Sequence, residues 1–197
     1  LEALKRQVHK KEGEVLLVSI SRLVHQKGID TIIRALPLLP AYVRLLIVGD
    51  GPDKDMLVSL AEELGVTDRV TFTGQVDRTM TAKYRKISDI FVSPSRSEGQ
   101  GISFVSTMVS GLPMIATQEG GLADFVFDAK RNPDKSTTGW VVDHDSPEQI
   151  AEKVQEILAN PEQTKKVVAT AREYAHDNFD WDVIARNIRE KVFGRVC

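Results

Sequence analysis

Two cations that follow the first apolar run are the residues best suited to chemistry. Arg22 and Lys27 come directly after residues 14–20 (EVLLVSI), which are typical of a buried strand. A guanidinium offers paired donors to a phosphate, and an ammonium adds a compact charge. Together they can hold a diphosphate and neutralise it as it leaves. The competing interpretation is two solvated charges, because surface loops commonly carry polar groups.

A glycine-rich segment after residues 89–92 is the second place where chemistry is expected. Ser97 and Glu98 lead through Gly99 and Gly101 into a predicted helix. Unpaired N–H groups and the positive end of the dipole make such a helix start an anion site. The Glu98 carboxylate can accept hydrogen bonds from sugar hydroxyls. The competing interpretation is that Ser97 or Glu98 caps the helix.

Two further pairs of glycines follow predicted strands and mark loops where a backbone or ligand comes close. They are Gly49 with Gly51, and Gly120 with Gly121. The Gly-x-Gly turn suggests a dinucleotide fingerprint, but the third glycine position holds Lys54. A tight turn that needs glycine geometry is therefore favoured at Gly49 and Gly51.

The elements that must position these loops alternate along the chain. Strands are expected at residues 14–20, 43–48, 69–73, 89–92, 113–117 and 140–142, and helices at 29–39, 53–64, 79–87, 101–110, 147–158, 161–176 and 181–193. Such alternation favours parallel strands joined by right-handed crossovers. Wholly apolar strands suit a sheet that is covered on both faces. We expect a doubly wound, Rossmann-like α/β sheet with a helical C-terminal tail, and ligands at the carboxyl ends of its strands.

Composition excludes several classes of protein. The chain has 197 residues, of which 42% are hydrophobic, enough for one domain with a full core. A formal net charge of −2 gives no reason to expect a nucleic-acid partner. Cys197 is the only cysteine, which excludes a disulfide framework and favours a cytoplasmic location. No apolar run approaches the roughly 20 residues of a membrane span.

Two other kinds of site are disfavoured. The four histidines share no metal-ligand spacing, so no metal is expected. Trp140, Trp181 and the phenylalanines are spread along the sequence like core residues rather than like a platform for stacked bases.

Taken in order, these segments resemble the C-terminal, donor-binding domain of the family 4 retaining glycosyltransferases of GT-B fold. The resemblance runs from about Val15 to the end. Its matching stretches are Ser21-Arg22-Leu23 with Lys27-Gly28, residues 48–52 (VGDGP), residues 69–74 (RVTFTG), Pro94-Ser95, residues 97–101 (SEGQG), and residues 108–117 (MVSGLPMIAT) followed by Gly120-Gly121. Each stretch is modest alone, and the specificity lies in their order and spacing.

The resemblance also implies a domain organisation. Residues 1–197 would form one nucleotide-sugar-binding domain, with a core at about 14–178 and a crossover-type helix at 179–197. The N-terminal, acceptor-binding domain would be absent. The first residue is Leu1 rather than methionine, which also suggests a fragment of a longer product.

The resemblance assigns roles to individual residues. Arg22 and Lys27 would bind the donor diphosphate, and Glu98 would bind the donor sugar, so these three form the catalytic set. The remaining donor-binding residues would be Gly99, Gln100, Gly101, Ile102 and Ser103 for phosphate and sugar, Gly74, Gln75 and Val76 for the base, and Ser106 for the ribose.

One departure from the family concerns the ribose. The family places a second glutamate eight positions after the first, and that position is Ser106 here. A serine makes only a shorter, uncharged contact. Thr107 stands where the family usually has alanine, and Gln100 replaces a common aromatic residue. These changes weaken the prediction of ribose anchoring but leave the phosphate contacts in place.

The implied reaction uses neither metal nor cofactor. A nucleoside diphosphate sugar would give its hexose, with retention, to a glycan, lipid or small-molecule acceptor held by the N-terminal half. The isolated chain would be inactive, and any membrane attachment would come through that half. The alternatives are a non-catalytic nucleotide-sugar-binding module, which Ser106 favours, and a GT-B nucleotide-sugar epimerase. A nicotinamide-dependent domain is disfavoured by the incomplete glycine fingerprint.

Overall fold

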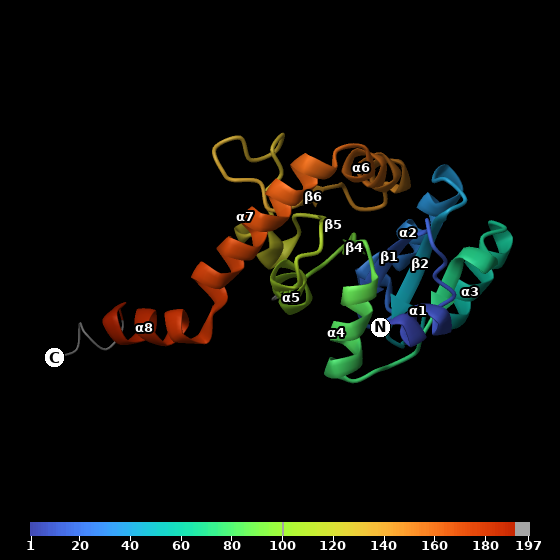
Figure 1. Cartoon of the computed structure of the whole chain (residues 1–197), viewed down its shortest axis with the longest axis horizontal. Coiled ribbons are helices and arrows are strands. Elements are labelled where there is room, and N and C mark those ends of the chain that lie inside the picture. The colour runs from blue at the N-terminus through green and yellow to red at the C-terminus, as the bar shows by residue number, and fades with distance from the viewer. Residues whose placement is uncertain (100, 192–197) are drawn as a thin grey trace.

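The computed structural model describes residues 1–99 and 101–191 (Figure 1). Within them, six parallel strands form one sheet in the order β3-β2-β1-β4-β5-β6. They are β1 (Val15–Ile20), β2 (Val43–Val48), β3 (Val70–Phe72), β4 (Ile90–Ser93), β5 (Met114–Ala116) and β6 (Trp140–Val141). The predicted doubly wound α/β fold is confirmed. The strand order reverses between β1 and β4, so their carboxyl ends form the switch point at which such sheets bind ligands.

Helices cover both faces of this sheet. One face carries α2 (Ile29–Ala35), α3 (Lys54–Glu63) and α6 (Pro147–Ala159). The other carries α1 (Glu2–Gln7), α4 (Arg78–Ile87), α5 (Ile102–Ser110) and α7 (Pro161–Phe179). The last described helix, α8 (Trp181–Lys191), extends from the end of α7 and lies away from the sheet (Figure 1).

The strands divide the core into two layers because successive side chains point to opposite faces. Leu17 packs with the α2, α3 and α6 layer, whereas Leu16 and Val18 pack with the opposite layer. In that second layer, Phe91 of β4 meets Phe104 of α5 edge to face, with ring centroids 5.3 Å apart. This contact places the start of α5 next to the end of β4.

The structure differs from the predicted elements at the ends of the chain. The sequence did not predict α1, which buries its own Leu4 and the following Val8 in the second layer. The predicted helix at 161–176 runs on to Phe179. Residues 192–193 of the predicted last helix, and Cys197, lie outside the described residues.

A smaller difference lies after α2. The predicted helix at 29–39 ends at Ala35 and continues as a 3₁₀ turn at Leu36–Leu38. Pro37 has no N–H for an α-helical hydrogen bond, which explains the change.

The two tryptophans lie in opposite environments. Trp140 is 4% exposed, as expected for a core residue. Trp181 is 79% exposed, so the expectation that it belongs to the core is wrong. The reason is its place at the start of α8, beyond the helices that cover the sheet (Figure 1). None of the helices in the described part of the chain combines the length and hydropathy needed to span a bilayer.

Candidate functional site

The loops that follow β1 and β4 meet at the switch point. Lys27 of the first loop and Glu98 of the second form an ion pair, with 2.8 Å between Nζ and Oε2. The Ser95 hydroxyl donates to the same carboxylate oxygen at 3.3 Å. The side chains of Lys27 and Glu98 are 22% and 13% exposed, so the pair is only partly shielded from water.

Glu98 does not cap α5. The cap residue is Gly101, with φ of 63° and no side-chain capping hydrogen bond. Oε1 of Glu98 instead accepts from the backbone N–H of Gly99, at 3.2 Å. The competing interpretation that Ser97 or Glu98 caps this helix is therefore wrong. The N–H groups of the first turn, including those of Ile102 and Ser103, have no intrahelical acceptor and are available to an anion.

Two adjoining cavities open at this edge of the sheet. One, of about 350 Å³, is lined by Ile20, Ser21, Arg22, Lys27, Ser93, Glu98, Gly101, Ile102, Ser103 and Phe104. The other, of about 380 Å³, is lined by Ile20, Ser21, Arg22, Val48, Gly49, Asp50, Gln75, Val76 and Thr81. Six of the residues expected to bind phosphate and sugar thus share one cavity: Arg22, Lys27, Glu98, Gly101, Ile102 and Ser103. Gln75 and Val76, expected to line a base pocket, border the next.

Arg22 lies where the two cavities join. Its side chain is exposed, and it makes no hydrogen bond or ion pair with any residue that the structure describes. The hydroxyl of neighbouring Ser21 is buried and likewise lacks a partner within those residues. A free guanidinium between two hollows suits a ligand whose anionic group lies in the middle.

The glycines after β2 and β5 allow neighbouring loops to touch. A Cβ on Gly49, whose φ is 138°, would overlap the carbonyl oxygen of Ser21, and one on Gly120 would overlap that of Glu98. Gly51 and Gly121 approach backbone carbonyls in the same way. Because they lack a Cβ, these glycines allow the loops at the switch point to pack closely against one another.

Not every residue of the predicted site lines the two cavities. Gly74 lies beside them and accepts a hydrogen bond from the Gly49 N–H at 3.0 Å. Ser106 lines neither cavity, and its hydroxyl donates to the carbonyl of Ile102 at 2.9 Å. Gly99 also lines neither, and Gln100 lies outside the described residues.

Sequence reasoning missed two arginines near the site. Arg96 stands two residues before Glu98 and contacts both the loop after β1 and the loop before α6. Its place in the glycine-rich segment was the only signal in the sequence. Arg85 is 6% exposed and donates to Thr107 and Ser103 of α5, at 3.3 and 3.1 Å. No carboxylate pairs with Arg85 among the described residues, and burial lowers the pKa of its guanidinium.

Two other features of the described residues bear on the site. They hold no group of three or more His, Cys, Asp or Glu side chains arranged to bind a metal ion. A larger hollow of about 1020 Å³ lies between α5, α7 and the start of α8, and shares no lining residue with the two cavities. Its position on the helical layer, away from the strand ends, separates it from the groups described above.

Comparison with known proteins agrees with the fold. Residues 2–174 match the family described as glycosyl transferases group 1. The chain is 35% identical over 188 residues to a GDP-mannose-dependent alpha-(1-6)-phosphatidylinositol monomannoside mannosyltransferase of Mycobacterium tuberculosis (strain CDC 1551 / Oshkosh), covering 90% of this chain and 47% of that protein.

Solved structures of other proteins have the same fold as this chain. A sucrose-phosphate synthase from Thermosynechococcus elongatus superposes with a TM-score of 0.83 at 28% identity, covering 100% of this chain and 49% of that one. Anabaena Alr3699/HepE, in complex with UDP-glucose, superposes with a TM-score of 0.85 at 23% identity, over 98% of this chain and 52% of that one. The chain thus spans about half the length of each of these three proteins.

Proposed function

The chain belongs to the glycosyl transferases group 1 family, and from this premise we propose that it is the half of a glycosyltransferase that binds a nucleoside diphosphate sugar. One observation carries the proposal. Arg22, Lys27, Glu98 and the first turn of α5 border a single cavity at the switch point. Cations, helix N–H groups and a carboxylate in one hollow match a ligand that joins a diphosphate to a sugar.

The residues divide the work according to their chemistry. In the proposed transfer, the bond between the anomeric carbon and the phosphate oxygen breaks, and its electron pair stays on that oxygen. Arg22, Lys27 and the α5 start stabilise the charge that develops there. Glu98 accepts hydrogen bonds from sugar hydroxyls and so orients the ring. The acceptor hydroxyl, held by an N-terminal half, attacks the anomeric carbon with net retention, and its proton passes to the departing diphosphate.

The name of one relative indicates which base and sugar to test first. The Mycobacterium tuberculosis relative is named for GDP-mannose, which makes GDP-mannose the first donor to test. Ser106 lines neither cavity, so we propose that the ribose is held by fewer contacts than a glutamate would give.

Calorimetric titration of the 197-residue chain with GDP, UDP and ADP, and then with GDP-mannose, tests donor binding. We expect one nucleotide to bind, and to stabilise the chain by about 2.7 kcal/mol at a hundredfold excess over Kd. Changing Arg22→Ala together with Lys27→Ala should abolish binding. Changing Arg34→Ala with Lys166→Ala removes the same charge from exposed positions elsewhere and should preserve it. Binding unaffected by the first pair, or absent throughout, contradicts the proposal.

A non-catalytic nucleotide-sugar-binding module is the second candidate, and the position of Ser106 outside both cavities favours it. Glu98→Gln separates the two functions in a protein that contains this chain and its N-terminal half. Lost transfer with binding of the free nucleotide retained supports the transferase. An unaltered protein that binds donor without transferring or epimerising its sugar supports the module.

A further inference from the structure

Arg96 joins three loops at the carboxyl edge of the sheet. Its guanidinium donates to both carboxylate oxygens of Asp30, from Nη1 at 2.9 Å and from Nη2 at 2.8 Å. Nη1 also donates to the His25 carbonyl at 2.6 Å, and Nε donates to Asp145 at 2.7 Å. The side chain is 15% exposed. Bidentate pairing with a carboxylate fixes orientation as well as distance.

These contacts bracket the loop that carries Lys27. Arg96 holds the carbonyl of His25 through its side chain and that of Gln26 through its own backbone N–H, at 2.8 Å. On the other side of Lys27, a Cβ on Gly28 would overlap the carbonyl oxygen of Pro94, so the two loops also touch there. The 2.8 Å contact between Lys27 and Glu98 lies between these two points of attachment.

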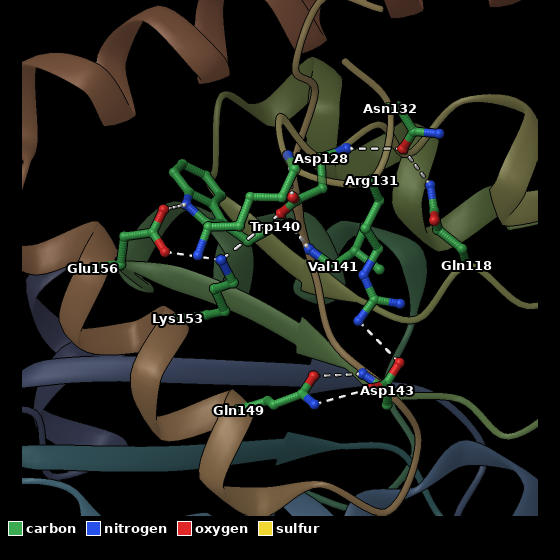
Figure 2. Close-up of polar contacts among 11 residues, drawn as sticks. Gln118, Asp128, Arg131, Asn132, Trp140, Val141, Asp143, Gln149, Lys153 and Glu156 are labelled. Carbon is green, nitrogen blue, oxygen red and sulfur yellow. Dashed lines mark hydrogen bonds and ion pairs between the residues drawn. The ribbon is translucent and has the colours of Figure 1, made fainter.

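Asp145 supplies a third anchor from the loop between β6 and α6. The preceding Asp143 is itself fixed, because its backbone N–H donates to Gln149 at 2.9 Å and Gln149 donates back to its carboxylate at 2.9 Å. Arg131 adds an ion pair to Asp143 at 2.9 Å (Figure 2). The loop that carries Asp145 is thereby fixed to α6, one of the helices that cover the sheet.

The charge of Arg96 is already matched by two carboxylates. Burial by itself would raise the pKa of Asp30, but the hydrogen bonds and charge of Arg96 outweigh burial and lower that pKa below its ordinary value. The hydrogen bonds that Arg96 donates to Asp30, opposed by burial and aided by Asp145, raise the pKa of Arg96. Asp30 and Arg96 are therefore charged at neutral pH. Arg96 is also paired with Asp145, so it keeps no charge for a ligand.

We propose that Arg96 is a positioning residue of the donor site, which sets the loop bearing Glu98 against the loop bearing Lys27 without contacting the donor. This inference rests on the proposed function. Arg96 lies outside both cavities, so its effect on the donor passes through Glu98 and Lys27. A role in folding alone would lower stability and leave donor affinity unchanged.

Titration of Arg96→Met with GDP-mannose and with GDP, far below the melting temperature, measures that effect. We expect the Kd for GDP-mannose to rise by about tenfold or more, as when a charge-assisted hydrogen bond is misplaced. The Kd for GDP should rise less, because GDP lacks the sugar that Glu98 orients. Arg96→Lys keeps the charge but loses the bidentate contact, and should give an intermediate value.

A double-mutant cycle with Glu98 separates positioning from folding. In a Glu98→Gln background, Arg96→Met should change the Kd for GDP-mannose by less than about twofold, because the group that Arg96 positions is already altered. Arg69→Met is the matched control. Arg69 donates to the carbonyls of Val43 and Pro40, at 2.9 and 3.1 Å, at the opposite edge of the sheet. It should lower the melting temperature and leave both Kd values unchanged.

A crystal structure of Arg96→Met without a ligand gives the distance between the Lys27 and Glu98 side chains directly. We expect the Lys27 and Glu98 side chains to lie beyond ion-pair distance. An unchanged contact together with an unchanged Kd for GDP-mannose overturns the proposal, as do equal losses in the native and Glu98→Gln backgrounds. If the unaltered chain binds neither GDP-mannose nor any of the three nucleotides, the proposed function fails and the donor role of Arg96 fails with it. The crystal structure still decides, separately, whether Arg96 sets the two loops.

Discussion

Two clusters of charged side chains in this protein differ in whether their hydrogen-bonding groups are fully used. We call the first the Asp128 cluster: Asp128, Trp140, Lys153 and Glu156 (Figure 2). Lys153, 7% exposed, lies 2.8 Å from Glu156 and 3.9 Å from Asp128. Glu156 accepts from the Trp140 indole at 3.0 Å, and Asp128 accepts from the Val141 N–H at 3.1 Å. Each charge in this cluster has an opposite charge within the cluster.

The switch point is organised differently. Arg96 is matched there by Asp30 and Asp145, while Lys27 has Glu98 as its partner and Arg22 has none among the described residues. The same residue types therefore serve two purposes. In the Asp128 cluster, charges that are paired with one another fix a loop against the sheet. At the switch point, the paired charges of Arg96, Asp30 and Asp145 support the neighbouring loops. Arg22 and Lys27 on the cavity wall keep hydrogen-bond donors that are available to a ligand.

The largest expected effect comes from breaking the Asp128 cluster. Asp128→Ala leaves Lys153 with only Glu156 and leaves the N–H groups of Val141 and Lys130 without their acceptor. We expect a loss of about 3 kcal/mol in the free energy of unfolding, since removing one partner of a buried pair is costly. Urea unfolding measures it. Donor affinity at low temperature should not change.

Asp134→Ala serves as the control for that change. Asp134 is exposed on the same stretch of chain, so its loss should alter stability by less than about 0.5 kcal/mol. A variant at Asp128 that weakened donor binding as strongly as it weakened folding would show that the two clusters are not separate in function.

An intermediate effect on stability is expected where a site loop packs on its neighbour. Gly120 has φ of 56°, and a Cβ there would overlap the Glu98 carbonyl. Gly120→Ala should cost about 1–3 kcal/mol of stability, as overpacking does, and should also raise the Kd for the donor by displacing Glu98.

Gly65→Ala is the matched control for Gly120→Ala. Gly65 has φ of 65°, but a Cβ there would meet nothing within 4 Å. Because no clash occurs there, Gly65→Ala measures only the loss in free energy of unfolding from placing an alanine in the left-handed region, about 1–2 kcal/mol. Donor binding should be unaffected. Equal effects of the two variants on binding would contradict the contact between Gly120 and Glu98.

The smallest expected effect is on how the free energy of unfolding depends on pH. The lowered pKa of Asp30 means that its ion pair with Arg96 contributes stability above the ordinary aspartate pKa of about 3.9. That contribution disappears as the pH falls through the lower pKa of the folded state. Asp30→Asn should therefore be less stable than the native chain at neutral pH, with the difference shrinking as the pH falls below the ordinary aspartate pKa. Unfolding curves across this range test the sign, and a difference that grows in acid would refute it.

The sheet and the meeting of Lys27 with Glu98 were predictable from the sequence, whereas the Asp128 cluster and the contacts of Arg96 were not. The strands appeared as apolar runs because both faces of the sheet are covered, and Lys27 and Glu98 could be placed together because both follow strands that end at one edge. Arg96 meets Asp30 and Asp145 across 66 and 49 residues, and no local pattern encodes such a contact. Glu98 was open to interpretation as a helix cap because capping and ligand binding favour similar residue types.

The opposite environments of the two tryptophans give the chain two built-in fluorescent reporters. Trp140 is buried and its indole is bonded within the Asp128 cluster, so its emission follows the integrity of the sheet. Trp181 stands in water at the start of α8, and its emission responds to anything that covers that surface. A Trp181→Phe chain reports unfolding alone, and a Trp140→Phe chain reports docking of a partner against α8. One spectrum of the native chain contains both signals.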